Sequence, residues 1–545
     1  MLLLEKKKYK NFKKMKKINF LVLTLFFAIG CFSQNAIQNS EKVNINKPNI
    51  VFILSDDLSF RDVSAYGQKN YKTPNIDKLC LTSARFTQAY AAAPECAPSR
   101  GSFLSGKHVG HGPIRLNSSA RGFEFLPKNT YTLAKMLQET GYKTGVVGKW
   151  GLGYKDDAGN PLKQGFDYHF GFLTHYEAHS YFPLVLYENN KEIHYPENKG
   201  MDIKPLYEKD RGNPDRIDFE KYYDQNGKLV YMNLAKAAYA PDLFDIKAAE
   251  FIHKNKKDPF FLWFATNLPH GPTIVDDFRQ LKDRKDMDIQ SREWGAMVQR
   301  LDISVGKLVD KLKEEGVYDN TIIIFASDNG YSMHNPTKGK GNKQNNGRPV
   351  WEDDPFLQNK GTFTGGKFTG LEGGMRIPFF IHMPKQDTPS VISEPVWLVD
   401  LFPTFASVSN SKPINGLDGY NLIPLMNGDR NSIPKDRFMY FTRKDEQAVR
   451  QGPWFAYRSH PKQDLELYLI EEDQLINVNL ASQYPQISAA MKTIIEREQV
   501  PAEWYWNPGD TQDIFNQKVK KAKETGQLIK NYRPNNIKLM PWETE

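Results

Sequence analysis

Cysteine is scarce in this chain of 545 residues, which holds three: Cys31, Cys80 and Cys96. Exported proteins that depend on disulfides usually carry more of them, so a disulfide framework is not expected. A single bridge between Cys80 and Cys96 remains an alternative at this stage. The scarcity also draws attention to Cys96, whose neighbours are polar and form a compact motif.

The chain has little net positive charge outside its N-terminal segment. The net charge is +9, but residues 1–17 hold eight lysines and one glutamate and so contribute +7, which leaves +2 for the rest of the chain. A polyanion-binding protein would carry its excess charge on the folded part. Nucleic-acid binding through bulk charge is therefore not predicted.

No apolar run near the N-terminus is long enough to span a bilayer comfortably, since the run there covers residues 20–29. Basic residues before it and small residues after it are typical of a secretory signal, which we place at residues 1–33. Met15 is an alternative start. Cys31 follows a short lipoprotein-like sequence, so a lipid anchor there is an alternative to simple cleavage. We expect export to the periplasm or the extracellular space.

Continuous apolar runs alternate with amphipathic segments along most of the chain. The segments with helical spacing are residues 75–85, 132–140, 242–254 and 291–315. The runs that predict buried strands are 49–54, 143–148, 259–265, 321–326 and 379–381. This alternation predicts an α/β fold with a mostly parallel sheet flanked by helices.

Polar side chains stand directly after four of these strands: Asp56 with Asp57, Lys149, His270, and Asp328 with Asn329. Ligand crevices of open α/β sheets lie along the carboxyl ends of the strands, so these side chains should meet at one edge. Two adjacent carboxylates repel each other; a turn cap would account for one of them, and a hard cation would account for both.

The stretch Cys96-Ala97-Pro98-Ser99-Arg100 precedes a run with helical character. Proline is suited to the first turn of a helix, where its missing N–H costs nothing. Cys96 would then lie at a helix N-terminus, which stabilises an anion or a nucleophile. The alternative is a small buried cysteine with no chemical role.

Four further regions complete the chain. Residues 165–200 are rich in aromatics and histidine, as in a substrate pocket or an aromatic core, and 336–349 read as a structureless surface loop. A glycine-rich stretch surrounds Lys367. Residues 431–545 read as a smaller α+β domain with a short antiparallel sheet and a surface tail; its predicted elements are strands 437–442, 454–457 and 465–469, a helix over 486–499, and the tail from about 505.

The stretch from Cys96 to Arg100, with Leu104-Ser105-Gly106 behind it, resembles the signature of type I sulfatases in the alkaline phosphatase superfamily. The resemblance covers about residues 49–427 and implies an alkaline-phosphatase-like catalytic domain over 46–430. It implies that Cys96 is converted to formylglycine by a maturation enzyme.

The resemblance also implies further site residues. A cation, Ca²⁺ or alternatively Mg²⁺, would be bound by Asp56, Asp57, Asp328 and Asn329, whose oxygens are hard ligands, and by Cys96 after its conversion. The implied catalytic residues besides Cys96 are Arg100, Lys149, His270 and Lys367.

One position departs from the family pattern. The family commonly has Gly-Lys-Trp-His after this strand, whereas this chain has Gly148-Lys149-Trp150-Gly151. A histidine that helps the formylglycine hydroxyl lose its proton is thus missing at 151. We expect His179 to replace it, with His175 as the alternative.

The resemblance implies hydrolysis of sulfate esters, on a sulfated carbohydrate or an aryl sulfate. An alternative within the superfamily is a phosphodiesterase or phosphonate monoester hydrolase, although such relatives often use serine or threonine and more than one metal. A different alternative is a non-catalytic protein that binds sulfated glycans, which would hold if Cys96 stayed unmodified. Contact with a membrane is expected only through a lipid anchor at Cys31.

Overall fold

The computed structural model describes residues 47–527, apart from 118, 123, 200–236, 272–274, 276, 288, 333–341, 345–347, 351–362, 364, 386–388, 472–473 and 477. The predicted signal peptide at 1–33, with Cys31, lies outside the described residues. Within the described part, no helix combines the length and the apolar composition that crossing a bilayer requires.

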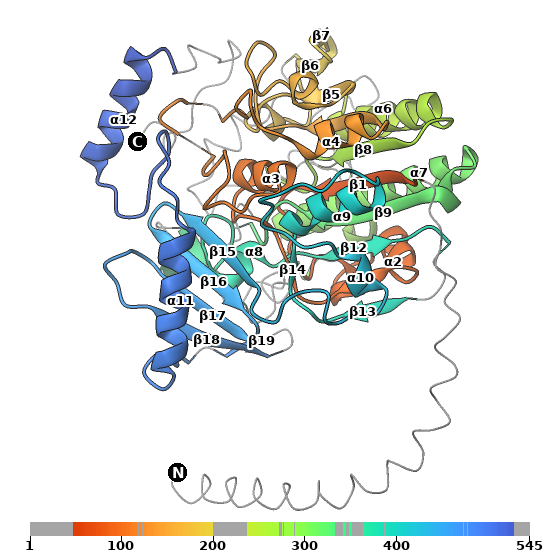
Figure 1. Ribbon diagram of the computed structural model, residues 1–545. Helices are drawn as coiled ribbons and strands as arrows, with labels where there is room; N and C mark the ends of the chain where they lie inside the picture. Colours follow the sequence, from red (N-terminus) through yellow and green to blue (C-terminus); the bar gives the residue numbers. More distant parts are fainter. Residues whose placement is uncertain are drawn as a thin grey trace, which may run out of the picture. The chain divides into compact units, whose positions relative to one another are not determined.

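A ten-stranded sheet forms the centre of the described structure (Figure 1), in the order β13-β2-β12-β9-β1-β8-β4-β5-β6-β7. In that order the strands are Ser390–Ile392, Ala84–Phe86, Phe379–His382, Thr321–Ser327, Asn49–Ser55, Phe260–Ala265, Lys143–Lys149, Tyr168–Phe172, Val185–Glu188 and Lys191–His194.

The middle of this sheet is parallel, as the sequence predicts. β9, β1, β8, β4 and β5 pair in parallel, whereas β12 and β6, which flank this block, pair antiparallel with it. The parallel strands are buried along most of their length, because helices cover both faces. The predicted α/β fold with a mostly parallel sheet is confirmed.

Alternate side chains of β8 show how the two faces are covered, since successive strand residues point to opposite sides. Phe260 packs against Phe251 of α6 (Ala240–Asn255). Phe261 packs instead against Phe405 of α9 (Leu401–Val408). On the Phe261 side, Trp263 contacts Phe103 of α3 (Cys96–Ser105).

The remaining helices follow the same two-sided arrangement. α4 (Leu133–Glu139) packs on α9, and α2 (Pro74–Cys80) packs on the long helix α7 (Ile289–Glu314), which also contacts α6. The apolar stripe predicted for α7 is buried: Met297, Leu301, Val305, Leu308 and Leu312. The shorter helices are α8 (Glu372–Met375) and α10 (Ile423–Met426).

A five-stranded antiparallel sheet follows in the order β15-β16-β17-β18-β19. Helix α11 (Pro485–Glu498) covers one face of it (Figure 1), and Met491, Ile494 and Ile495 pack there against strand side chains. The predicted short antiparallel sheet is therefore present; the domain boundary near 430 stays a prediction. The strands are Phe438–Arg443, Glu446–Gln451, Trp454–Arg458, Glu466–Glu471 and Gln474–Ile476.

Three local predictions are wrong. The helix predicted over 75–85 ends at Cys80, because Thr82 and Ser83 bond their hydroxyls to the Leu79 carbonyl and the chain then enters β2. Within the loop predicted to be structureless, 342–344 (β10) pairs with 348–350 (β11), the rest of 336–349 lying outside the described residues.

The third error concerns the predicted tail. Residues 512–524 form the helix α12 (Gln512–Glu524), which Thr511 caps by accepting a hydrogen bond from the Ile514 N–H. Phe515, Val519 and Ala522 recur at the i, i+4 and i+7 spacing of a helix, a short apolar stripe that the prediction of a tail overlooked among the surrounding charged residues. Of these three side chains, Ala522 is the one that is buried. Residues 528–545 lie outside the described part.

Candidate active site

Two neighbouring strands bring four oxygen-bearing side chains to one edge of the sheet. β1 and β9 pair in register up to Ser55 and Ser327, so Asp56 and Asp57 emerge beside Asp328 and Asn329. All four side chains are completely buried. Asp57 has a left-handed backbone with φ of 68°. This conformation is energetically unfavourable for residues other than glycine and is found preferentially at functional sites.

Three cations enter the same cluster from other elements. Lys149, at the end of β4, places Nζ 2.6 Å from Asp56 Oδ2, and Lys367 places Nζ 2.8 Å from Asp57 Oδ1. Arg100 on α3 donates from Nε and Nη2 to Asp328 Oδ2 at 2.9 and 2.8 Å. Each carboxylate thus has a cationic partner.

The protonation states follow from this pairing. Burial on its own would raise the pKa of Asp56 and of Asp57, but the Lys149 ammonium, His270 and Lys367 outweigh it and hold both pKa values below the usual one. Burial would likewise lower the pKa of Lys149, yet the Asp56 carboxylate raises it. The acids are therefore ionised and Lys149 is charged at neutral pH.

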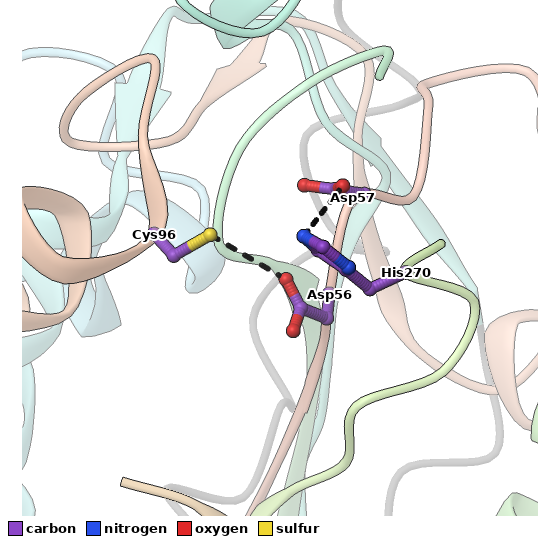
Figure 2. Close-up of side chains that lie close together, drawn as sticks. All are labelled: Asp56, Asp57, Cys96 and His270. Atoms are coloured by element: carbon purple, nitrogen blue, oxygen red, sulfur yellow. Dashed lines mark hydrogen bonds and ion pairs between the residues drawn. The ribbon is translucent and has the colours of Figure 1, made fainter. Parts of the chain in front are cut away.

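Cys96 begins helix α3 and points into this cluster (Figure 2). Its Sγ lies 3.6 Å from Asp56 Oδ1. Burial raises the pKa of the thiol to about 12, so an unmodified Cys96 would be a poor nucleophile at neutral pH. Cys80 and Cys96 are separate buried thiols, which rules out a disulfide between them.

His270 follows β8 and faces Asp57 (Figure 2), with Nε2 3.3 Å from Asp57 Oδ2. Its Nδ1 lies 2.6 Å from the Gly271 carbonyl, which accepts the ring N–H. Nε2 is then left as an acceptor, 3.0 Å from Lys367 Nζ. Burial lowers the pKa of His270 to about 4, so the ring is neutral at pH 7.

The donor set fits a hard divalent cation. Donor atoms of Asp56, Asp57, Cys96 and His270 lie within 4.8 Å of one another. In addition, Asp57 Oδ2 and Asn329 Oδ1 are buried oxygens that accept no hydrogen bond from any described residue. Buried oxygens are rarely left this way unless something else binds them. The oxygens favour calcium or magnesium chemistry over that of thiolate-binding metals.

The two histidines considered as substitutes at position 151 both reach the site. His179, at the end of the short helix η4 (Glu177–His179), stacks on His270 with ring centroids 4.4 Å apart. His175 packs against Gly151 instead: a Cβ atom at 151 would lie 3.4 Å from the His175 Cβ. Gly151 has φ of +79°, a backbone that a histidine there would adopt only with strain.

Sequence reasoning missed residues that hold the site together. Glu95 precedes Cys96 and accepts a hydrogen bond from the Asn117 N–H at 2.7 Å. The Tyr181 hydroxyl lies 2.7 Å from the carbonyls of Asn267 and His270 and so fixes the loop that carries His270. Tyr181 stands among many aromatics in the sequence, and no local signal separates it from core residues.

Comparison with known proteins identifies the family. The family model described as Sulfatase matches residues 48–411. An N-acetylgalactosamine-6-O-sulfatase of Bacteroides thetaiotaomicron is 27% identical over 516 residues, covering 86% of this chain and 96% of that protein. Human arylsulfatase H is 29% identical over 445 residues, covering 72% of this chain and 75% of that protein.

A solved structure agrees over nearly the whole chain. The crystal structure of Ps i-CgsB in complex with k-i-k-neocarrahexaose has a TM-score of 0.67 and 28% identity, covering 88% of this chain and 99% of that one. Membership in the family implies a metal ion and formylglycine, and the cluster around Cys96 has the groups to hold both. The predicted family is confirmed: this chain belongs to the sulfatases, the hydrolases of sulfuric esters.

Proposed function

We propose that the chain hydrolyses sulfate esters of a sulfated carbohydrate, with formylglycine made from Cys96 and with calcium as its metal ion. The observation that carries this proposal is the convergence of Cys96, three carboxylates, three cations and His270 at one sheet edge. Support for a carbohydrate comes from the N-acetylgalactosamine-6-O-sulfatase and from the oligosaccharide in the Ps i-CgsB complex.

Formylglycine and a divalent cation would supply part of the chemistry. Formylglycine at position 96 would supply, as its hydrate, two hydroxyl groups on one carbon, so that one could serve as the nucleophile and the other would allow the aldehyde to form again, which a thiol does not offer. A divalent cation on Asp56, Asp57, Asp328 and Asn329 supplies positive charge next to the sulfate oxygens. Because the three carboxylates are already matched by three cations, such an ion would leave the pocket positive and suited to an anion.

The cations of the chain divide into two roles. Lys149 and Lys367 are held at the cluster by one carboxylate each, and we assign both to the sulfate oxygens, where they stabilise charge that builds up during reaction. Arg100 donates to Asp328 and to the Lys149 carbonyl and is fully buried. We therefore assign Arg100 the positioning of Asp328 and Lys149.

The leaving alcohol requires a proton. Lys367 Nζ lies 3.0 Å from His270 Nε2, and these two atoms form a pair that can hold and pass on one proton. The Tyr181 hydroxyl donates a hydrogen bond to the His270 carbonyl and so holds the loop that carries His270. We propose that this pair protonates the leaving oxygen.

For the proton acceptor beside Cys96, the position of Gly151 favours His175 over His179. His175 fills the space next to Gly151, and burial together with Lys149 and the neighbouring cations lowers its pKa to about 3, which keeps it a neutral base. We expect His175→Ala to lower kcat on 4-nitrophenyl sulfate by about 10²–10⁴-fold, the usual range for a general base, and His179→Ala to lower it less. The reverse order would return the role to His179.

The test of the proposed function combines mass and turnover. Conversion of Cys96 makes the chain about 18 Da lighter, which intact mass spectrometry of protein from its native host resolves. We expect that mass together with turnover of 4-nitrophenyl sulfate, and neither in Cys96→Ser. An unmodified Cys96 would contradict the proposal and favour a non-catalytic glycan-binding protein, whereas faster turnover of 4-nitrophenyl phosphate would favour a phosphoesterase.

We also propose export of the protein. Residues 1–33 have the basic, apolar and small segments of a secretory signal, and Cys31 offers a site for lipid attachment. Cell fractionation with detection of the mature N-terminus tests this: a chain that begins at Cys31 and stays with membranes indicates lipidation. A maturation enzyme that oxidises Cys96 is the partner that the proposal requires.

A further inference from the structure

The tip of the β15–β16 hairpin meets the two chain segments that carry Cys96 and Lys367. Arg443 ends β15 and pairs in register with Glu446, which begins β16. Glu446 Oε2 accepts a hydrogen bond of 2.7 Å from the Gly370 N–H, three residues after Lys367. The Arg443 guanidinium lies 4.9 Å from the ring centre of Phe368. Arg443 and Glu446 of the five-stranded sheet thus contact the chain segment that carries Lys367.

Arg443 is held in place from two sides. Its Nε donates to Oε1 of Glu95, the residue before Cys96. Glu95 is itself fixed, because its other oxygen accepts from the Asn117 N–H. The Phe368 ring contacts two cations, since the Lys367 ammonium lies 5.3 Å and the Arg443 guanidinium 4.9 Å from its centre. The guanidinium is therefore presented at a set place, next to the helix that begins with Cys96.

Part of this guanidinium is left to bind something else. Nη1 and Nη2 of Arg443 donate no hydrogen bond to any described residue, and 15% of the side chain is exposed. Two neighbouring guanidinium nitrogens form a planar fork that matches the oxygens of a sulfate or a carboxylate. An arginine whose Nε is fixed by a carboxylate loses little freedom when that fork binds an anion.

Lys444 and Asp445, the next two residues of the chain, lie beside Trp506. Lys444 is exposed and pairs with no acidic side chain among the described residues, and its Nζ lies 5.9 Å from the ring centre of Trp506. The neighbouring Asp445 is occupied, since Oδ1 accepts from Trp506 Nε1 at 3.0 Å and from the Gly509 N–H at 2.8 Å. A second positive charge and an aromatic ring therefore follow Arg443 at this hairpin tip.

We propose that Arg443 binds a second anionic group of the substrate, a sulfate or carboxylate other than the one that is hydrolysed, and thereby selects glycans with more than one anionic group. This inference rests on the proposed function and narrows its substrate class. It makes Arg443 a specificity-determining residue that the C-terminal sheet contributes to the active site.

The experiment compares substrates that share one reaction and differ in charge. The probes are 4-nitrophenyl sulfate and matched pairs of monosulfated and disulfated oligosaccharides, of the galactosamine and galactan types. The variants are Arg443→Ala and Arg443→Lys, with Lys492→Ala as the matched loss of one cation, since Lys492 is 58% exposed on α11. Melting temperature shows whether each variant is folded.

We expect the wild type to prefer the disulfated member of a pair. Arg443→Ala should lower the ratio of kcat/KM for the disulfated over the monosulfated substrate at least tenfold, mainly through KM. Its turnover of 4-nitrophenyl sulfate should stay within about threefold of the wild type. Arg443→Lys should keep aryl sulfate turnover and lose most of the preference, because an ammonium retains charge without the planar fork. Lys492→Ala should match the wild type on every substrate.

Three outcomes would overturn the inference. One is an equal loss on aryl and disulfated substrates in folded Arg443→Ala, which would make Arg443 a brace for the catalytic segments. The others are an unchanged preference in that variant and a wild type without preference in any pair. A wild type that hydrolyses no sulfate ester at all would instead defeat the proposed function.

Discussion

Among the residues that the structure describes, two groups of side chains have the composition of a metal site, and they differ in what surrounds them. The first is the strand-end cluster of Asp56, Asp57, Cys96 and His270. The second, which we call the C-terminal clasp, consists of His108, His111, Asp418 and Glu498; in it the donor atoms of His108, His111 and Asp418 also lie within 4.8 Å of one another. Proximity of ligand atoms alone does not separate them.

Hydrogen bonding distinguishes the two groups, because the polar atoms of the clasp find hydrogen-bond partners within the protein. His108 Nδ1 accepts from the Gly110 N–H at 3.1 Å, so Nε2 carries the ring proton and donates to Glu498 Oε2 at 3.1 Å. A metal-bound imidazole uses one nitrogen for the metal and donates a proton from the other, which this arrangement does not allow. His111 Nδ1 lies 3.1 Å from Asp418 Oδ2. The clasp thus joins the loop after α3 to the end of α11 without an ion.

The strand-end cluster is the opposite case. Asp57 Oδ2 and Asn329 Oδ1 accept no hydrogen bond from any described residue, although both are buried. Each carboxylate there has a cationic partner from another element: Asp56 pairs with Lys149, Asp57 Oδ1 with Lys367, and Asp328 with Arg100 of α3. Unsatisfied oxygens also occur singly elsewhere, for example Asp245 Oδ1 and Glu372 Oε2. The comparison teaches that unsatisfied lone pairs within a group of converging ligands, and not the proximity of ligands alone, mark the place where this chain is built to bind an ion.

The largest effect that this comparison predicts concerns one carboxylate from each group. Asp57→Asn keeps the shape of the side chain but removes a charged oxygen from the strand-end cluster, and we expect kcat/KM on 4-nitrophenyl sulfate to fall by about 10³-fold or more. Asp418→Asn, the matched change in the clasp, should stay within about threefold. Similar losses in both variants would mean that the clasp takes part in the reaction.

Metal content sharpens the comparison next. We expect one divalent ion per chain in the wild type, measured by elemental analysis of the purified protein, and loss of turnover on chelation that added Ca²⁺ restores. Asp57→Asn should carry far less metal, whereas His108→Gln should carry as much as the wild type. Two ions per chain, with the second lost in His108→Gln, would show that the clasp binds metal after all.

Much of the strand-end cluster could be predicted from the sequence, because each buried parallel strand is a continuous apolar run and its polar side chains follow directly. Asp56 and Asp328 could be assigned to one sheet edge for that reason. The place of His175 could not, since it depends on a left-handed backbone at Gly151, 24 positions away in the chain, and on how two loops meet.

Contacts between distant segments were equally hidden. Arg443 bonds to Glu95 across 348 positions, and nothing in either local sequence indicates the partner. The helix α12 is a different case, because Phe515, Val519 and Ala522 do recur at helical spacing and the many lysines around them obscured that signal. The contact of Arg443 is tertiary, whereas the helix could have been predicted from its local sequence.

A stability effect without an activity effect is expected from the clasp. His108 is 2% exposed, so His108→Ala leaves a cavity and removes a hydrogen-bond partner from Glu498 and from the Gly110 N–H. We expect the free energy of unfolding to fall by about 2–4 kcal/mol. Chemical denaturation measures it, with His194→Ala as control, since the His194 side chain is 65% exposed. A fall equal to that of the control would contradict the role of the clasp.

The smallest expected effect is a change in how stability depends on pH. Burial lowers the pKa of His108 more than Glu498 and Asp418 raise it, so the folded state binds this proton less readily than the unfolded state does. The stability that His108 contributes is therefore complete above its unfolded pKa of about 6.5 and is lost as the pH falls below that value. His108→Gln, which can still donate to Glu498, should lose less melting temperature between pH 7.5 and 5.5 than the wild type.

Other buried groups titrate in the same range but do not affect this difference. Burial raises the pKa of Asp62 to about 7, so Asp62 stabilises the fold as the pH falls, opposite in sign to His108. Asp62 is present in both proteins, and its contribution cancels when their melting temperatures are subtracted. A His108→Gln protein with the same pH dependence as the wild type would mean that the pKa of His108 is the same in the folded and unfolded states. A His108→Gln protein that loses more melting temperature than the wild type would mean that His108 is charged in the folded state. The clasp would then be held by ion pairs, as the strand-end cluster is.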